Sequence, residues 1–126
     1  MRHLVMFLMM PVFLISCAYD YTPPQPDMTF SLKNGDYLEI YFGYSSIGCE
    51  AKINIRNNSN RSKSIYIELT AYDRDGKNID STNFLINNLN SNEIAERSSV
   101  FTRVDYCGDI GKISAGSRSY WKKNYY

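Results

Sequence analysis

The fold is decided by residues 47–56, Ile47-Gly48-Cys49-Glu50-Ala51-Lys52-Ile53-Asn54-Ile55-Arg56, in which apolar side chains alternate with small or polar ones. Successive side chains of a β-strand point to opposite faces of a sheet, so this period of two predicts a strand with one buried face. The predicted inward row consists of Ile47, Cys49, Ala51, Ile53 and Ile55. The opposite row, which carries Glu50, Lys52 and Arg56, is expected to face solvent.

The same period continues on both sides of this stretch. Before it, the predicted rows are Phe30 and Leu32, then Leu38, Ile40 and Phe42. After it, Ile65, Ile67, Leu69 and Ala71 form an inward row opposite Tyr66, Glu68, Thr70 and Tyr72. A weaker strand is expected over residues 79–86. A further strand over residues 94–104 is expected to carry Val100, Thr102 and Val104 on one face.

Turn signals separate these strands. Asn34-Gly35 is a strong hairpin signal, and Asp73-Arg74-Asp75-Gly76 predicts a tight turn in which Gly76 adopts a positive φ. Exposed loops are expected over residues 57–64 and 87–93. No ten-residue segment has a sustained helical period. About seven short strands at this spacing predict an all-β fold, an antiparallel β-sandwich of the immunoglobulin or fibronectin III kind.

An apolar run from Leu4 ends in Leu14-Ile15-Ser16-Cys17. Its length is typical of a signal peptide and is too short for a transmembrane helix, which needs about 20 residues. The last four residues resemble the lipobox of bacterial lipoproteins, which implies cleavage before Cys17 and acylation of Cys17. The alternative is an ordinary secretory signal with a chance cysteine. The expected organisation is a signal peptide (1–16), a lipidated cysteine with a proline-rich tether (17–27) and a β-sandwich domain (28–126).

The other two cysteines, Cys49 and Cys107, form an even pair once Cys17 is acylated. In an oxidising compartment such a pair predicts one disulfide, and two free or metal-binding thiols are the alternative. His3 is the only histidine and lies in the predicted signal peptide. This position argues against catalysis by a histidine base and against a histidine-ligated metal. We therefore predict no catalytic residue, no metal site and no cofactor, and we do not expect an enzyme.

One segment carries a further resemblance. Its residues are Leu69-Thr70-Ala71-Tyr72-Asp73, Asp75-Gly76-Lys77, Leu89 and Asn92-Glu93. Together they resemble the FxLYD-type and related immunoglobulin-like modules of bacterial envelope proteins. Ala71 stands where that family has leucine, and Asn92 stands where it has glycine. The resemblance implies an immunoglobulin-like fold and no particular activity.

The C-terminal stretch is the best candidate for a binding site, because aromatic and basic side chains of the kinds enriched at binding hot spots gather there. The predicted partner-binding residues are Tyr120, Trp121, Lys122 and Lys123, with Tyr66 and Tyr72 as secondary contacts. The alternative is a last strand in which Tyr120 packs inward and the lysines remain in solvent.

Two acidic patterns favour structural roles. Asp73-x-Asp75-Gly76 resembles the start of a calcium loop, but the later ligands that such a loop requires are missing, which favours a hairpin turn. Glu39, Glu50 and Glu68 are expected on solvated strand faces. They are not expected to face one another across a cleft, as the carboxylates of a glycoside hydrolase do.

The net charge and the predicted cellular location complete the functional hypothesis. Residues 1–16 contain Arg2 and no acid, so the 14 basic and 13 acidic side chains become 13 of each, which argues against binding to nucleic acid. We expect a membrane-anchored envelope lipoprotein, held in the bilayer by acylated Cys17, that acts as a non-catalytic module binding or assembling an envelope protein partner. Ala18, by resemblance to enterobacterial lipoproteins, favours the outer membrane.

An inhibitor of lysozyme or another hydrolase is the alternative function. Ser114-Ala115-Gly116-Ser117-Arg118 resembles a Ser-Ala-Ser-Gly-Ala-Arg stretch of lipidated C-type lysozyme inhibitors. Cys107 lies before this stretch, whereas in the inhibitors the cysteine follows it.

Overall fold

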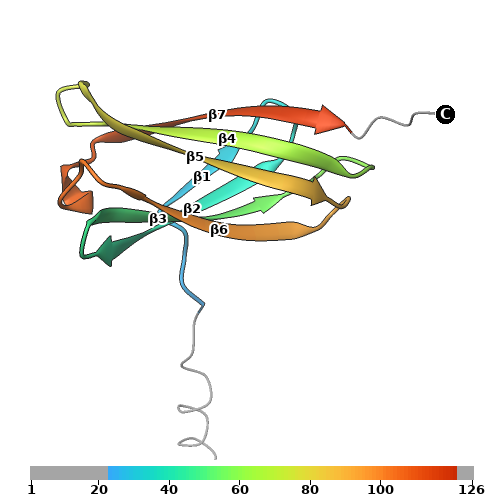
Figure 1. The fold of residues 1–126 in the computed structure, drawn as a ribbon, viewed down its shortest axis with the longest axis horizontal. Coiled ribbons are helices and arrows are strands. Elements are labelled where there is room, and N and C mark those ends of the chain that lie inside the picture. Colours follow the sequence, from blue (N-terminus) through green and yellow to red (C-terminus); the bar gives the residue numbers. More distant parts are fainter. Residues whose placement is uncertain (1–22, 122–126) are drawn as a thin grey trace, which may run out of the picture.

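The computed structural model describes residues 23–121, apart from the side chain of Trp121. This part of the chain forms seven strands and one short 3-10 helix (Figure 1). The elements are β1 (Met28–Ser31), β2 (Tyr37–Ser45), β3 (Gly48–Arg56), β4 (Lys63–Tyr72), β5 (Asn78–Leu89), β6 (Ile94–Phe101), η2 (Cys107–Asp109) and β7 (Lys112–Trp121). The prediction of an all-β domain is confirmed.

Two antiparallel sheets pack face to face (Figure 1). The larger sheet has the strand order β1-β2-β3-β6, and the smaller has the order β5-β4-β7. The predicted antiparallel β-sandwich is thus confirmed, and it has the layered architecture of immunoglobulin-like domains. Its connectivity differs from the ABED and CFG sheets of an immunoglobulin constant domain, because β2 and β3 pair with each other here instead of lying in opposite sheets.

Both predicted hairpin turns are present. Gly35, between β1 and β2, has a φ of 87°, and Gly76, between β4 and β5, has a φ of 86°. Only glycine adopts this backbone region at no steric cost. These turns set the registers of β1 on β2 and of β5 on β4.

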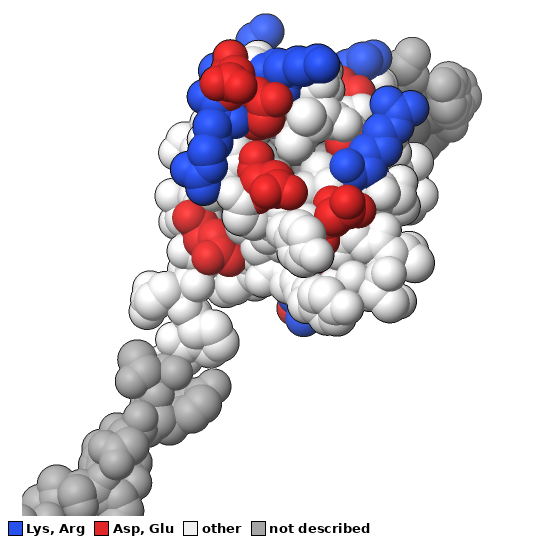
Figure 2. All heavy atoms as spheres, turned by 90° about the vertical axis from the view of Figure 1, so that its left-hand side faces the viewer, with Lys and Arg blue, Asp and Glu red and all other residues white. Residues whose placement is uncertain are grey.

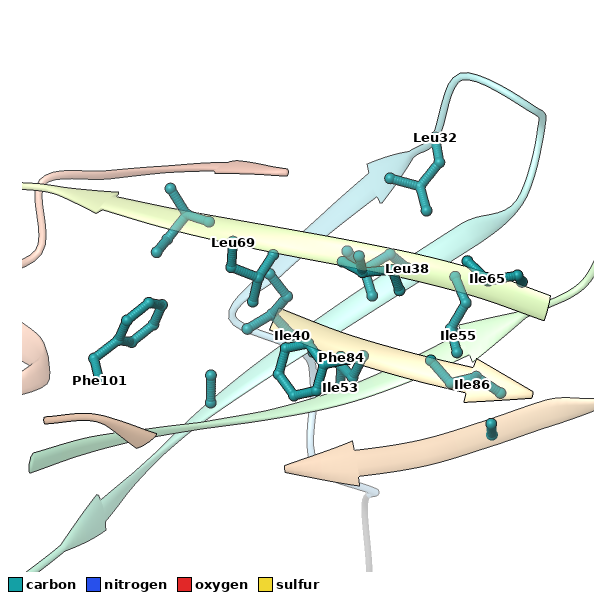
Figure 3. Packing of buried hydrophobic residues seen from close by; sticks show 14 of the residues in the cluster. Leu32, Leu38, Ile40, Ile53, Ile55, Ile65, Leu69, Phe84, Ile86 and Phe101 are labelled. Atoms are coloured by element: carbon teal, nitrogen blue, oxygen red, sulfur yellow. The ribbon is translucent and has the colours of Figure 1, made fainter. Parts of the chain in front are cut away.

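The core lies between the two sheets and consists mainly of the predicted inward rows (Figure 3). Leu38 is in register with Ile55, and Ile40 with Ile53, on the inner face of the larger sheet. The inner row of β4 faces them with Ile65, Ile67, Leu69 and Ala71, which are all fully buried. Burial of each large aliphatic side chain contributes about 1.5–3 kcal/mol, so these rows account for most of the driving force for folding.

The inward row of β3 begins later than the sequence suggested. Ile47 was expected to point inward, but it lies in the turn between β2 and β3 and is exposed. The strand begins at Gly48, which has a φ of 149° and lies so close to the backbone of Phe101 that a Cβ would collide with it. Ile47 therefore lies outside the alternation.

The prediction that Val100, Thr102 and Val104 share one face of a strand is wrong. Val100 lies in register with Glu50 on the outer face, and Thr102 follows the end of the strand and is exposed. The buried residues are Phe101 and Val104. The backbone turns after Phe101, where the Val104 amide donates to the Phe101 carbonyl at 3.1 Å, so alternation does not extend to Val104.

Residues 57–64 are only partly the exposed loop that was expected. Asn57 is buried, and its side-chain amide donates to the carbonyl oxygens of Arg61 and Leu89 at 3.0 and 2.8 Å. β4 already begins at Lys63, whose Nζ lies 2.7 Å from Asp36 Oδ2 in a buried ion pair. β5 continues to Leu89, so the loop expected over residues 87–93 is shorter than predicted.

Candidate functional site

Aromatic and basic side chains pair across β4 and β7 on the outer face of the smaller sheet. Tyr66 is in register with Arg118, and Tyr72 with Lys112. The Arg118 guanidinium carbon lies 5.6 Å from the centroid of the Tyr66 ring, and Lys112 Nζ lies 5.5 Å from that of Tyr72. Both distances are within the range of cation–π attraction. These contacts hold two long basic side chains against the sheet.

Two exposed side chains extend this surface. Tyr120 of β7 is in register with Ser64 and is 50% exposed, and Leu85 of β5 is in register with Tyr66 and is 54% exposed. The resulting surface, which we call the aromatic–cationic face, consists of Tyr66, Tyr72, Leu85, Lys112, Arg118 and Tyr120. Exposed Glu68 lies in the same outward row of β4, between the two tyrosines.

Three of the predicted partner-binding residues, Tyr66, Tyr72 and Tyr120, therefore lie on one surface. The alternative in which Tyr120 packs inward is wrong, since half of its side chain is exposed. Trp121 ends β7 with its backbone in register with Lys63, but its side chain lies outside the described residues. Lys122, Lys123 and the lipidation candidate Cys17 lie outside them as well. Partner binding itself stays a prediction.

Lys112 and Leu85 were not predicted as members of this surface. Alternation counted back from Tyr120 through β7 reaches Arg118 and then Lys112, so the sequence did contain that signal. It contained no indication that β7 pairs with β4, because the register between strands distant in the chain depends on the whole sheet. This pairing is what places the basic side chains over the tyrosines.

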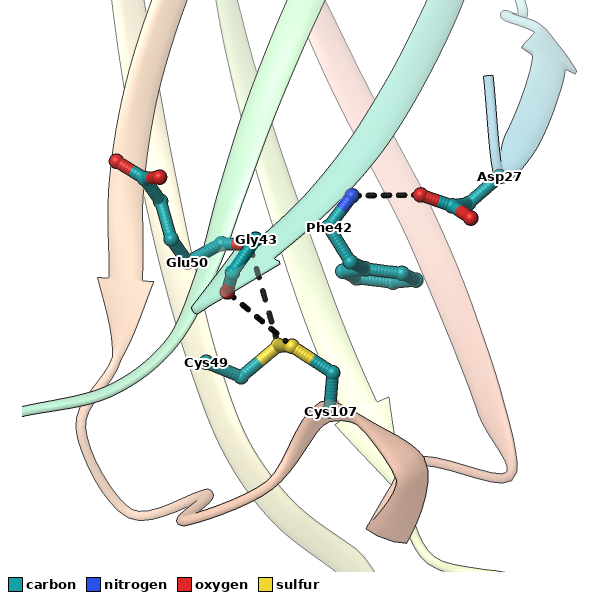
Figure 4. Close-up of a disulfide and its surroundings, with 6 residues drawn as sticks. All are labelled: Asp27, Phe42, Gly43, Cys49, Glu50 and Cys107. Carbon is teal, nitrogen blue, oxygen red and sulfur yellow. Dashed lines mark hydrogen bonds between the residues drawn. A yellow bond between two sulfur atoms is a disulfide. The ribbon is translucent and has the colours of Figure 1, made fainter. Parts of the chain in front are cut away.

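A disulfide joins β3 to η2 at one end of the sandwich (Figure 4). Cys49 and Cys107 have an S–S distance of 2.05 Å and a Cα–Cα distance of 5.0 Å, which confirms the predicted bridge. Cys107 Sγ also lies 3.4 Å from the Gly43 carbonyl oxygen of β2. An oxidised sulfur has no hydrogen to donate, so this is a packing contact. The bridge fixes the loop between β6 and β7 against the β2–β3 hairpin.

Large apolar side chains are exposed at this disulfide-bonded end. Tyr44 is 86% exposed, Tyr106 70% and Ile47 62%. Tyr44 and Tyr106 line a hollow of about 300 Å³ together with Phe42 and the two cysteines. Tyr44 belongs to the inward row of β2, but its exposure shows that the smaller sheet does not cover this end of the hairpin. Sequence reasoning missed these residues because alternation does not reveal where the facing sheet stops.

A second hollow, of about 400 Å³, lies on the outer face of the larger sheet, lined by Pro23, Pro24, Tyr41, Phe42, Gly43, Glu50, Lys52, Asn54 and Glu96. Tyr41 Oη donates to Glu39 Oε1 at 3.4 Å. Desolvation, and then the negative charge of Glu39, raise the pKa of the Tyr41 phenol above its ordinary value of 10.0. Tyr41 therefore stays protonated at neutral pH and serves as a hydrogen-bond donor beside the hollow.

The predicted carboxylates are distributed over both sheets. Glu39 and Glu50 are half-buried on the outer face of the larger sheet, and Glu68 is exposed on the outer face of the smaller one. The Asp73 carboxylate accepts the backbone N–H groups of Asp75 and Lys77, both at 2.9 Å, as expected of a hairpin turn. No group of three metal-ligating side chains is found within residues 23–121.

In the part of the chain that the structure describes, no helix has the length and apolar character needed to cross a membrane. Comparison of the chain with protein families, curated proteins and solved structures gave no match.

Proposed function

We propose that this chain is a lipid-anchored protein of the bacterial cell envelope, delivered to the outer membrane, whose β-sandwich binds an envelope protein partner without catalysing a reaction. The observation that carries the binding proposal is the aromatic–cationic face. It presents tyrosine, leucine and arginine side chains on an open sheet surface. Tyrosine and arginine are among the residue types that contribute most binding energy at protein interfaces.

These side chains are held in place on the sheet, and this supports the proposal. Tyr66 and Tyr72 alternate with fully buried Ile65, Ile67, Leu69 and Ala71 on β4, the central strand of the smaller sheet, so their backbone is anchored in the core. Arg118 and Lys112 are held over the tyrosine rings before any partner binds. Side chains that are already ordered lose less conformational entropy on association, which favours binding.

The anchor is proposed from the lipobox resemblance at Leu14-Ile15-Ser16-Cys17. Each CH₂ group buried in the bilayer contributes about 0.8 kcal/mol, so two or more acyl chains on one cysteine hold a protein to the membrane durably. We expect the full chain to incorporate labelled fatty acid and to fractionate with membranes. Cys17→Ala should lose both the label and the firm membrane association; a variant that kept them would contradict the anchor.

Crosslinking in intact cells tests the binding proposal. We expect a discrete envelope protein crosslinked to the wild-type chain, with its yield reduced about tenfold or more in the variant Arg118→Ala/Tyr120→Ala, as befits hot-spot residues. The matched control is Lys52→Ala/Ile94→Ala, which removes one basic and one exposed apolar side chain from the outer face of the larger sheet. This control should keep the wild-type yield.

Equal yields in the two variants would contradict binding through the aromatic–cationic face. A wild-type chain that crosslinks to no envelope protein would contradict the partner proposal as a whole. In that case inhibition of lysozyme by the purified chain is the next measurement, because it tests the alternative function directly.

A further inference from the structure

We call the exposed side chains at the disulfide-bonded end, Tyr44, Ile47 and Tyr106, the apolar tip. The apolar tip lies close to the point where the chain enters the domain. Pro23 and Pro24 line one hollow together with Phe42 and Gly43. Phe42 and Gly43 also line the hollow that contains Tyr44 and Tyr106. The entering chain and the tip thus lie on either side of the same part of β2.

Charged side chains are unevenly distributed at this end of the molecule. Figure 2 shows Lys, Arg, Asp and Glu interspersed over the upper part of the end face, which belongs to the side of the smaller sheet. Fewer charged side chains lie on the lower part, on the side where the chain enters the domain (Figure 2). Asp105 also lines the hollow of Tyr44 and Tyr106, so the exposed tyrosine and isoleucine side chains, and not an absence of charge, favour transfer of this surface out of water.

The length of the tether limits how far the domain can lie from its anchor. Pro23 follows Cys17 by six residues, which span about 20 Å at most when fully extended. If Cys17 is acylated, as proposed above, the part of the domain next to Pro23 cannot lie farther than this from the headgroups. The apolar tip is in that part.

Tyrosine has the chemistry of the membrane interface, because its ring favours the acyl boundary and its hydroxyl remains hydrated. We propose that the apolar tip inserts into the headgroup region of the bilayer to which the chain is anchored. This inference rests on the lipid anchor of the proposed function. Figure 1 shows the smaller sheet on the side away from the entering chain, so contact through the tip leaves the aromatic–cationic face free for a partner.

Photo-crosslinking in intact cells tests this contact. A photoreactive phenylalanine analogue replaces Tyr44, Ile47 or Tyr106 in the full chain. The matched controls replace Leu85, Ile94 or Tyr120, which are also half-exposed or more but lie on the outer faces of the two sheets. Cells are labelled with ³²P-phosphate, so that a ³²P signal on the protein reports a crosslinked phospholipid. The diacylglyceryl group on a lipoprotein cysteine contains no phosphate and gives no signal.

We expect the ³²P signal at the three tip positions to exceed that at the control positions about fivefold or more. Fatty-acid labelling of the same variants reports the anchor separately, and the Cys49–Cys107 disulfide on a non-reducing gel reports folding. An anchored, disulfide-bonded chain with equal or no ³²P signal at all positions would overturn the inference and leave the proposed function intact. Crosslinks from the tip to a protein in place of lipid would overturn it as well. A chain without fatty acid on Cys17 would overturn the anchor and the inference together.

Discussion

At the residue scale, Lys63 and Asp36 form an ion pair whose side chains are almost completely removed from water. Asp36 Oδ1 also accepts the backbone N–H of Asn58 at 3.0 Å, so the carboxylate ties β4 to two loops. Removal of one member of a buried pair leaves the other charge uncompensated, at a cost of about 3–5 kcal/mol. We expect Lys63→Met to lower the free energy of unfolding by about this amount in urea titrations followed by circular dichroism.

A double-mutant cycle separates the interaction energy between Lys63 and Asp36 from the packing contribution of each side chain. Lys63→Met/Asp36→Asn removes both charges, so its loss of stability should be smaller than the sum of the two single losses. Lys52→Met, at an exposed position of β3, is the surface control and should change the unfolding free energy by about 0.5 kcal/mol or less. A Lys63→Met variant as stable as this control would show that the pair contributes little to stability.

Gly48 leads to a second prediction at the same scale. Its φ of 149° is strained for any other residue, and a Cβ at this position would collide with the Phe101 backbone. Backbone strain of this kind costs about 1–3 kcal/mol, and the collision adds to it, so Gly48→Ala should lower the midpoint of thermal unfolding by several degrees or more. Gly116→Ala is the control, because a Cβ there meets no atom within 4 Å. Equal midpoints for the two variants would refute the steric account.

At the scale of elements, alternation predicted the facing of β2, β3 and β4 because each of these strands stays regular along its buried length. Leu38 and Ile40 lie opposite Ile55 and Ile53, as two regular inward rows should. The prediction failed where a strand ended. Val104 was expected on the same face as Val100, but the backbone turns after Phe101, so Val104 points into the core while Val100 points outward. A period of two defines two faces within a strand, but it defines neither the strand's ends nor which face is buried.

The corrected facing of β6 is testable by substitution. Phe101 is fully buried and in register with Cys49, whereas Val100 is in register with Glu50 on the outer face. Phe101→Ala should therefore cost about 3–5 kcal/mol of unfolding free energy, the usual range for a buried aromatic side chain. Val100→Ala should cost about 1 kcal/mol or less, because it leaves no core cavity. A larger loss for Val100→Ala than for Phe101→Ala in the same denaturant titration would contradict this facing of β6.

At the scale of the whole molecule, the candidate surfaces arise from pairing that no local pattern contains. The sequence did indicate that Tyr66, Tyr72 and Tyr120 belong to outward rows. Only the β5-β4-β7 order joins these rows into one aromatic–cationic face. Tyr44 lies in the inward row of β2 but is exposed, because no part of the facing sheet covers it. Side-chain type and alternation are local properties, whereas sheet order and overlap depend on the packing of the complete chain.

The disulfide acts on the same scale, because Cys49 and Cys107 are 58 residues apart and their bond closes much of the domain into one loop. Chain entropy assigns about 4 kcal/mol of stabilisation to a loop of this size, mainly through restriction of the unfolded state. We expect Cys49→Ala/Cys107→Ala to lower the unfolding free energy by up to about 4 kcal/mol. The denaturant dependence should become steeper, because the uncrosslinked unfolded chain exposes more surface.

The position of the disulfide also predicts which parts of the native protein lose protection from hydrogen exchange when the bond is removed. The strands keep their core contacts without the bond, so hydrogen exchange in β3 and β4 should become faster only in proportion to the loss of global stability. Residues 102–111, which η2 and the bridge hold against the β2–β3 hairpin, should lose protection first. Wild-type protein reduced with a thiol is the matched control and should reproduce the double variant in both measurements. A double variant that lost less than about 1 kcal/mol would mean that the unfolded chain is already compact around residues 49–107, and that entropy of loop closure is not what the bridge contributes.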